Sequence, residues 1–141
     1  MDQEQRIAYA TALLRVSLGI MYLAHSIVLK LLTFGLAGTA DYFVSIGLPG
    51  WLAYLTFAAE AIGGLFLVLG IQVRLISLAL MPALVGAILF AHAGNGWVFT
   101  APGGGWEYPL YLLVLSVAQA LLGEGAFALP SLRRPPSVFA H

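Results

Sequence analysis

The chain has 141 residues, of which 61% are hydrophobic and only 9% are charged, and its mean hydropathy is +0.96. A soluble domain usually carries about 25% charged residues, so this composition indicates a membrane protein. The formal net charge of zero, with a single basic pair at Arg133-Arg134, gives no indication of nucleic-acid binding. The sequence contains no cysteine, which excludes disulfides, thiolate metal sites and thiol catalysis by this chain.

Four apolar stretches dominate the sequence, and each approaches the roughly 20 residues that a helix needs to cross a bilayer core. They lack the period-2 alternation of strands, and a lipid-exposed backbone permits only helices or closed barrels. The sequence therefore predicts an all-α fold, an integral membrane four-helix bundle in one domain over residues 1–129. The predicted spans are about 7–32, 48–70, 75–93 and 106–122, followed by a short cytoplasmic tail at 130–141.

The first apolar stretch is predicted to be retained rather than removed as a signal peptide. Asp2 and Glu4 offset the charge of Arg6, and the apolar run is longer than the 7–15 residues typical of a signal-peptide core. The stretch also carries Arg15 and His25. We therefore treat it as the first membrane span.

The basic residues predict the orientation of the bundle. The loops at 33–47 and 94–105 contain no Lys or Arg, whereas basic residues flank the spans on the opposite side. By the positive-inside rule, both termini are expected in the cytoplasm of a bacterial-type cell, with the protein in its inner membrane. The aromatic, glycine-rich loop 97–106 is expected either to fold over the bundle as a lid or to rest among the lipid headgroups. The flanking basic residues are Arg6, Arg74, Arg133 and Arg134.

Ionisable residues within the spans are the strongest functional signal. A charge at mid-bilayer costs roughly 2.5–3.5 kcal/mol on insertion scales, so such residues normally face the bundle interior, find partners and mark function. Arg15 and Glu60 are predicted at similar depths in the first two spans, which favours an ion pair between them. That pair would serve either as a polar link between helices or as part of a functional site. The ionisable residues are Arg15, His25, Lys30, Glu60, His92 and Glu107.

Four of these residues are expected to converge towards the external side. His25 and His92 lie in the outer third of the first and third spans, and Lys30 and Glu107 lie about one turn further out. The sequence therefore predicts an outward-facing polar pocket. Its further candidate lining residues are Tyr22, Ser26, Trp106 and Tyr108.

Several ligands are compatible with these residue types. His25, His92 and Glu107 are an acceptable ligand set for zinc, copper or non-haem iron, although each would come from a different helix. Two histidines could also ligate a haem. A quinone needs only a histidine or lysine donor and an aromatic pocket, and we favour it over metal or haem. A purely structural hydrogen-bond network remains an equal alternative.

The ordered motifs resemble those of the DoxX family of small four-helix membrane proteins, over roughly Arg15 to Gly125. That family includes DoxD-type subunits linked to thiosulfate:quinone oxidoreductases and is related to the methylamine-utilisation protein MauE. The resemblance implies the fold and a placement beside redox enzymes more than a particular reaction. One departure is Ser26, which stands where the family usually has Gly. The motifs are Arg15-Val16-Ser17-Leu18-Gly19, Ala24-His25, Lys30, Glu60-Ala61-Ile62-Gly63-Gly64, Leu69-Gly70, Arg74, His92 and Gly104-Gly105-Trp106-Glu107.

The predicted function is a redox-associated, quinone-linked subunit or accessory protein, and any enzymatic role would be that of an oxidoreductase subunit. One alternative is a small carrier for a proton, ion or solute, with Arg15 and Glu60 as an inner gate. Another is a non-catalytic assembly partner. The expected partners are the lipid bilayer and either oxidoreductase subunits or further copies of the chain.

Overall fold

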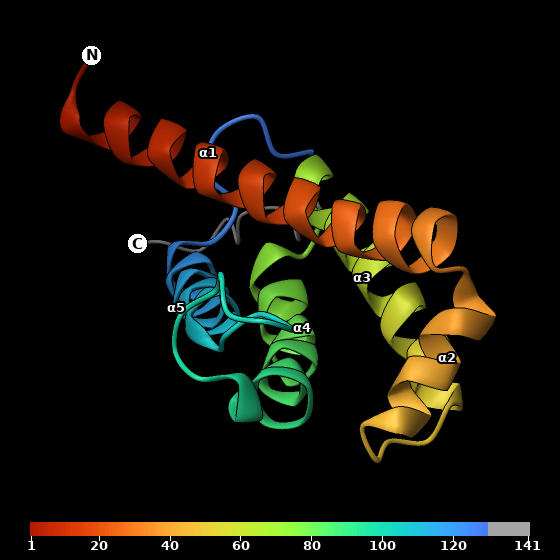
Figure 1. Cartoon of the computed structure of the whole chain (residues 1–141). Coiled ribbons are helices and arrows are strands. Elements are labelled where there is room, and N and C mark those ends of the chain that lie inside the picture. The colour runs from red at the N-terminus through yellow and green to blue at the C-terminus, as the bar shows by residue number, and fades with distance from the viewer. Residues whose placement is uncertain (130–141) are drawn as a thin grey trace.

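The computed structural model describes residues 1–129, and these residues form helices joined by turns and loops, without a β-strand (Figure 1). This confirms the predicted all-α fold. The predicted tail at 130–141 lies outside the described residues. In chain order the elements are α1 (Gln3–Leu23), the π-helix η1 (Ala24–Thr33), α2 (Leu36–Ser45), α3 (Trp51–Leu69), α4 (Val73–Gly86), the π-helix η2 (Ala87–His92), the 3-10 turn η3 (Ala93–Asn95) and α5 (Glu107–Leu122).

The apolar helices match a membrane bundle. Among residues 1–129, three continuous helical segments are long and apolar enough to cross a membrane, namely Gln3–Thr33, Trp51–Leu69 and Val73–Asn95. The fourth, α5, is apolar but has only 16 residues. The helices therefore occupy the four predicted regions, although the first begins earlier than residue 7 and the last is shorter than a full span.

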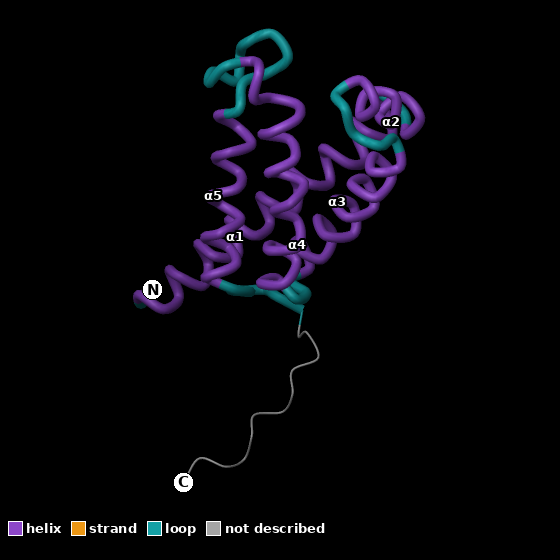
Figure 2. Tube along the Cα trace, turned by 90° about the horizontal axis from the view of Figure 1, so that it is seen from below, coloured by secondary structure: helices purple, strands orange, loops and turns teal. Residues whose placement is uncertain are grey.

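The bundle has two distinct ends (Figure 2). The N-terminus and residues 123–129 lie at one end, and α2 and the loop 96–106 lie at the other. Between the ends, α1 packs mainly on α3, and α4 packs mainly on α5. The segment 33–47 was expected to be a loop, and this expectation was wrong in part, because ten of its residues form α2 after a turn at Gly35 (φ +71°).

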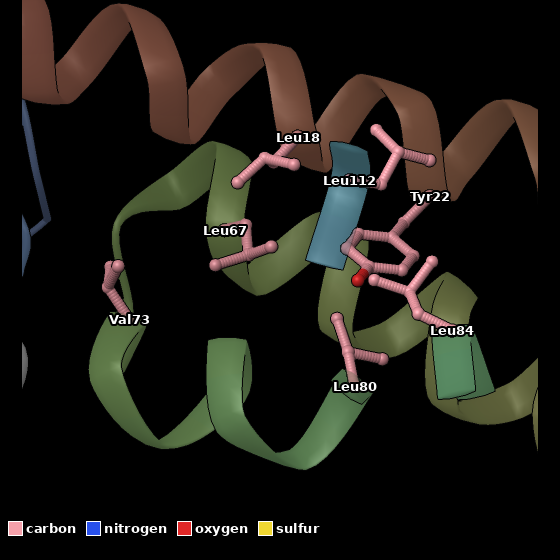
Figure 3. Close-up of a cluster of buried hydrophobic side chains, with 7 residues drawn as sticks. All are labelled: Leu18, Tyr22, Leu67, Val73, Leu80, Leu84 and Leu112. Atoms are coloured by element: carbon pink, nitrogen blue, oxygen red, sulfur yellow. The ribbon is translucent and has the colours of Figure 1, made fainter. Parts of the chain in front are cut away.

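The interior is filled by side chains from all four long helices (Figure 3). The α1 and α3 backbones approach closely at Gly19 and Gly64. A Cβ atom added at Gly19 would lie 2.8 Å from the carbonyl oxygen of Gly64, so only glycine fits there. Such small residues let membrane helices pack tightly. The central cluster comprises Leu18, Tyr22, Leu67, Val73, Leu80, Leu84 and Leu112.

Candidate functional site

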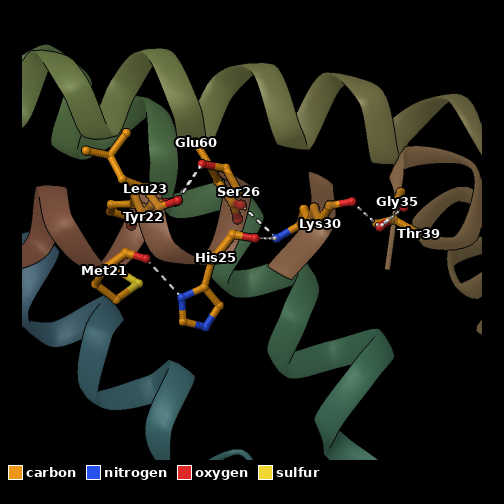
Figure 4. Close-up of polar contacts among 9 residues, drawn as sticks. All are labelled: Met21, Tyr22, Leu23, His25, Ser26, Lys30, Gly35, Thr39 and Glu60. Atoms are coloured by element: carbon orange, nitrogen blue, oxygen red, sulfur yellow. Dashed lines mark hydrogen bonds and ion pairs between the residues drawn. The ribbon is translucent and has the colours of Figure 1, made fainter. Parts of the chain in front are cut away.

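The central polar contact of the bundle is an ion pair between α3 and the π-helical end of the first helix (Figure 4). Lys30 Nζ lies 2.7 Å from Glu60 Oε2, and the two side chains are only 16% and 10% exposed. The predicted Arg15–Glu60 pair was therefore wrong. Lys30 belongs to a π-helix, whose wider turn changes the direction of its side chains relative to a regular α-helix.

Backbone and α2 groups surround this ion pair. Lys30 Nζ lies 3.5 Å from the carbonyl oxygen of His25, a further acceptor for the ammonium group. The buried Thr39 of α2 donates its hydroxyl to the carbonyl oxygens of Lys30 at 3.1 Å and Gly35 at 2.8 Å. Helix α2 is thus hydrogen-bonded to the C-terminal end of the first helix. Thr39 was missed because its segment was predicted to be a loop.

Arg15 is at the other end of the bundle and is 1% exposed. Its guanidinium donates to the backbone carbonyl oxygen of Glu124. Glu124 belongs to residues 123–129, here called the closing strap, which folds back against the helices. Backbone hydrogen bonds hold the strap against α1 and α3, from Ala126 N to Ala8 O at 3.0 Å and from Leu129 N to Leu69 O at 2.8 Å. The second arginine near the strap, Arg74, packs its guanidinium beside Gly123.

Tyr22 and Ser26 lie in the packed interior. The Tyr22 hydroxyl is 3.4 Å from Ser116 Oγ of α5, and Ser116 donates to Leu112 O at 2.8 Å. Ser26 donates to the carbonyl oxygen of Tyr22 at 2.9 Å. Both side chains are almost fully buried, so they form part of a polar core rather than the wall of an open pocket.

The His25 side chain points towards α5. Its Nδ1 lies 3.0 Å from Met21 O, and its ring stacks on Tyr108 with centroids 6.3 Å apart and planes at 26°. His25 thus supports an aromatic side chain at the start of α5.

The other three predicted pocket residues organise the loop before α5. His92 Nδ1 lies 2.9 Å from Gly104 O, and Glu107 Oε2 accepts the Phe99 amide at 3.1 Å. Trp106 packs edge-on against Trp97 at 4.5 Å between ring centroids. The loop is therefore a structured cap on α4 and α5, held by side chains that were predicted to contact a ligand.

The three residues named as metal-ligand candidates do not form a cluster. Within residues 1–129, no group of three or more His, Cys, Asp or Glu side chains is placed to hold a metal ion. His25 contacts Tyr108, whereas His92 and Glu107 bind different parts of the loop. The proposed ligand set of His25, His92 and Glu107 is therefore not assembled in this structure.

An open pocket of about 470 Å³ lies beside the loop, at the end of the bundle that carries α2. Its walls are the rings of Phe99, Tyr108 and Tyr111, and its one charged group is Glu107. Of these, Glu107 and Tyr108 were predicted, while Phe99 and Tyr111 were missed. Phe99 enters the wall only because the loop folds back on Glu107, and no sequence pattern signals that contact. Tyr111 could have been found from its position one turn after Tyr108 on the same helix.

Comparison with known proteins identifies two similarities. The family model described as DoxX matches residues 10–93. A Bacillus subtilis (strain 168) protein named "Putative oxidoreductase CatD" is 35% identical over 120 residues, which cover 84% of this chain and 83% of that protein. No solved structure is significantly similar to the chain.

Proposed function

This chain belongs to the DoxX family, and from that premise we propose that it binds a quinone at the loop end of the bundle, as a membrane subunit or accessory protein of an oxidoreductase. The observation that carries the proposal is the pocket of three aromatic rings around one carboxylate. The oxidoreductase name of the Bacillus relative supports a redox association for this chain.

The pocket residues fit a quinone in shape and in polarity. A planar ring can stack on Tyr108 or Tyr111, and aromatic pairs gain about 0.5–1.5 kcal/mol beyond the area that they bury. Tyrosine hydroxyls can donate to a quinone carbonyl, and a carboxylate oxygen accepts from a quinol hydroxyl. Glu107 uses Oε2 for the Phe99 amide, which leaves Oε1 available for a ligand hydroxyl.

When bound, a quinone would supply reversible two-electron, two-proton chemistry. The chain would hold the ring between aromatic side chains, and Glu107 would accept or return a proton at a ligand hydroxyl. His25 would keep Tyr108 in its stacked position. The electrons would pass to or from a partner oxidoreductase subunit, and a second copy of this chain is the other candidate partner.

The proposed setting is the bacterial inner membrane, with the strap end of the bundle facing the cytoplasm. Two arginines near the strap end support this orientation, Arg6 close to the start of α1 and Arg74 at the start of α4. The pocket would then open near the outer surface, where a quinone headgroup can enter laterally from the membrane.

Quinone binding to purified protein tests the proposal. Native mass spectrometry with a short-chain ubiquinone analogue should show one bound ligand on the wild type. Replacing Tyr111 by Ala should weaken binding by up to about tenfold, since roughly 0.5–1.5 kcal/mol of ring stacking is lost. Tyr54→Ala is the matched control, because Tyr54 is an exposed tyrosine on α3 outside the pocket. Equal binding by both variants, or no binding by the wild type, would contradict the proposal.

A further inference from the structure

Polar side chains form a column through the interior of the bundle, from the closing strap to α2. On the first helix, Arg15, Tyr22, Ser26 and Lys30 face inwards at intervals of one or two turns. They extend over about 20 Å along the helix axis. Buried polar groups are costly in a membrane bundle, so a continuous series of them indicates a pathway or relay.

Polar side chains from the other helices contact these residues of the first helix. Tyr22 meets Ser116 of α5. Leu23 of α1 lies next to Gly64 of α3. Glu60, one turn earlier on α3, lies beside Ser26, as Figure 4 shows. Glu60 then binds Lys30. The half of the column nearer to α2 is therefore polar at every turn.

The half nearer to the strap is completed by α4 and α5. Helices α4 and α5 pack against each other, and the contact of Arg74 with Gly123 sets their relative register. Because the two helices run in opposite directions, counting from Arg74 and Gly123 at the regular helical rise is expected to bring Ser77 near the level of Gln119, which is one turn from Ser116. Gln119 in turn donates to Gly123 O at 2.7 Å, beside the Glu124 carbonyl that Arg15 binds.

Three buried atoms at this end lack a protein partner among the described residues: Arg15 Nε, Ser77 Oγ and Gln119 Oε1. They belong to side chains that are at most 1% exposed. The first is a donor, the last is an acceptor, and the serine hydroxyl can be either. A water molecule both donates and accepts, so this mixed set suits water, whereas an anion would be repelled by Gln119 Oε1.

From this column we infer a second activity, separate from the quinone site: a hydrated proton path through the bundle. Protons would pass between Glu124 and water held by Arg15, Ser77 and Gln119. From there they would reach the Tyr22 and Ser116 hydroxyls and finally Glu60, where Lys30 balances the charge. No electron or covalent bond is transferred, and each hydroxyl or water gives up one proton as it accepts another.

The surroundings of the column favour protons over larger cations. Leu18, Leu67 and Leu80 pack directly around it and are at most 2% exposed, which leaves no open channel for a hydrated ion. Both ends are covered, by the strap and by α2, so the path opens when one cover moves.

Proton flux into vesicles tests the inference. Purified protein is reconstituted in synthetic lipids that contain no quinone, with potassium and a pH-sensitive dye inside, and valinomycin then drives proton entry. Wild-type vesicles should acidify faster than protein-free vesicles. Tyr22→Phe and Gln119→Leu, which keep side-chain size but remove the relay groups, should lose this increase.

Ser17→Ala is the matched control, since Ser17 is on α1 but exposed on its outer surface, and it should conduct like the wild type. Ser116→Ala gives a second interruption should either larger variant fail to fold. Acidification of wild-type vesicles at the protein-free rate would overturn the inference, as would wild-type flux in folded Tyr22→Phe and Ser116→Ala. Because no quinone is present, failure here leaves the quinone proposal standing, and failure of quinone binding leaves this result unchanged.

Discussion

Lys30 and Glu60 are 30 residues apart in the chain, yet their charged atoms lie 2.7 Å apart in the bundle interior. The pair joins the first helix to α3 at the level where α2 closes the bundle. The attraction between the two charges offsets the cost of burying them, because an unpaired ion in this setting would carry a desolvation penalty of several kcal/mol.

Removing one member of this pair should destabilise the protein more than removing both. Glu60→Leu leaves the Lys30 ammonium without its carboxylate and should lower the free energy of unfolding by about 3 kcal/mol, the lower end of the range for broken buried pairs. The double variant Lys30→Leu/Glu60→Leu should recover most of that loss. Thermal unfolding in mild detergent, analysed as a double-mutant cycle with Lys30→Leu, measures the coupling. Additive losses would show that the pair contributes nothing.

The glycine contact between α1 and α3 should tolerate no side chain. In Gly64→Ala the new Cβ would lie 2.9 Å from the Gly19 carbonyl oxygen, so the helices must separate, at an overpacking cost of about 1–3 kcal/mol. Gly86→Ala on α4 is the matched control, because nothing lies within 4 Å of its added Cβ. That control should be neutral or slightly stabilising, since alanine favours helix. Chemical unfolding measures the free energy of unfolding of both variants, and equal values would contradict the close contact between the helices.

The closing strap should depend on Gly125. Its φ of +68° disfavours a side chain by about 1–2 kcal/mol, and an added Cβ would lie 2.8 Å from the Ala8 carbonyl oxygen. Gly125→Ala should therefore release the strap and expose Arg15. Hydrogen exchange at the Ala126 amide, which bonds to Ala8 O, should become at least about tenfold faster. Gly94→Ala, with open space around it, should leave that exchange unchanged.

The loop beside the pocket should depend on an acceptor at position 107. Glu107→Ala removes the carboxylate that binds the Phe99 amide, so exchange at that amide should accelerate. Glu107→Gln keeps a side-chain oxygen in place and should preserve most of the protection. The same two variants also distinguish the structural role of Glu107 in the loop from a role in ligand binding. If a quinone needs the carboxylate itself, both variants should lose quinone binding, although only Glu107→Ala loosens the loop. Unchanged exchange in Glu107→Ala would mean that other contacts hold the loop.

The helices themselves could be predicted because a helix that crosses the bilayer needs a long run of apolar residues, which is visible in the sequence. Runs of apolar residues and their glycine boundaries gave the four long helical regions. Helix α2 was missed because a ten-residue helix between two glycine turns has neither the length nor the hydrophobicity of a span. Its position depends on Thr39 bonding to Lys30 O, a tertiary contact that no local pattern encodes.

The candidate site could be predicted in its residue types but not in its pairing. Depth was counted at a regular helical rise, which placed Arg15 near Glu60. In the structure η1 departs from that geometry and brings Lys30 to Glu60, while the strap supplies the carbonyl for Arg15. Likewise, His92 was predicted to face a ligand, but the Gly104 carbonyl was not visible as its partner until the loop was seen folded.

The shortness of α5 has a consequence for the surrounding membrane. Its 16 residues rise about 24 Å, against a hydrocarbon core of about 30 Å, whereas the continuous helix Gln3–Thr33 is longer than the core. Lipids that contact α5 must therefore compress, and those beside the first helix must stretch unless the helix tilts. The protein should impose a thickness gradient on its lipid annulus and favour thin regions of membrane on the α5 side.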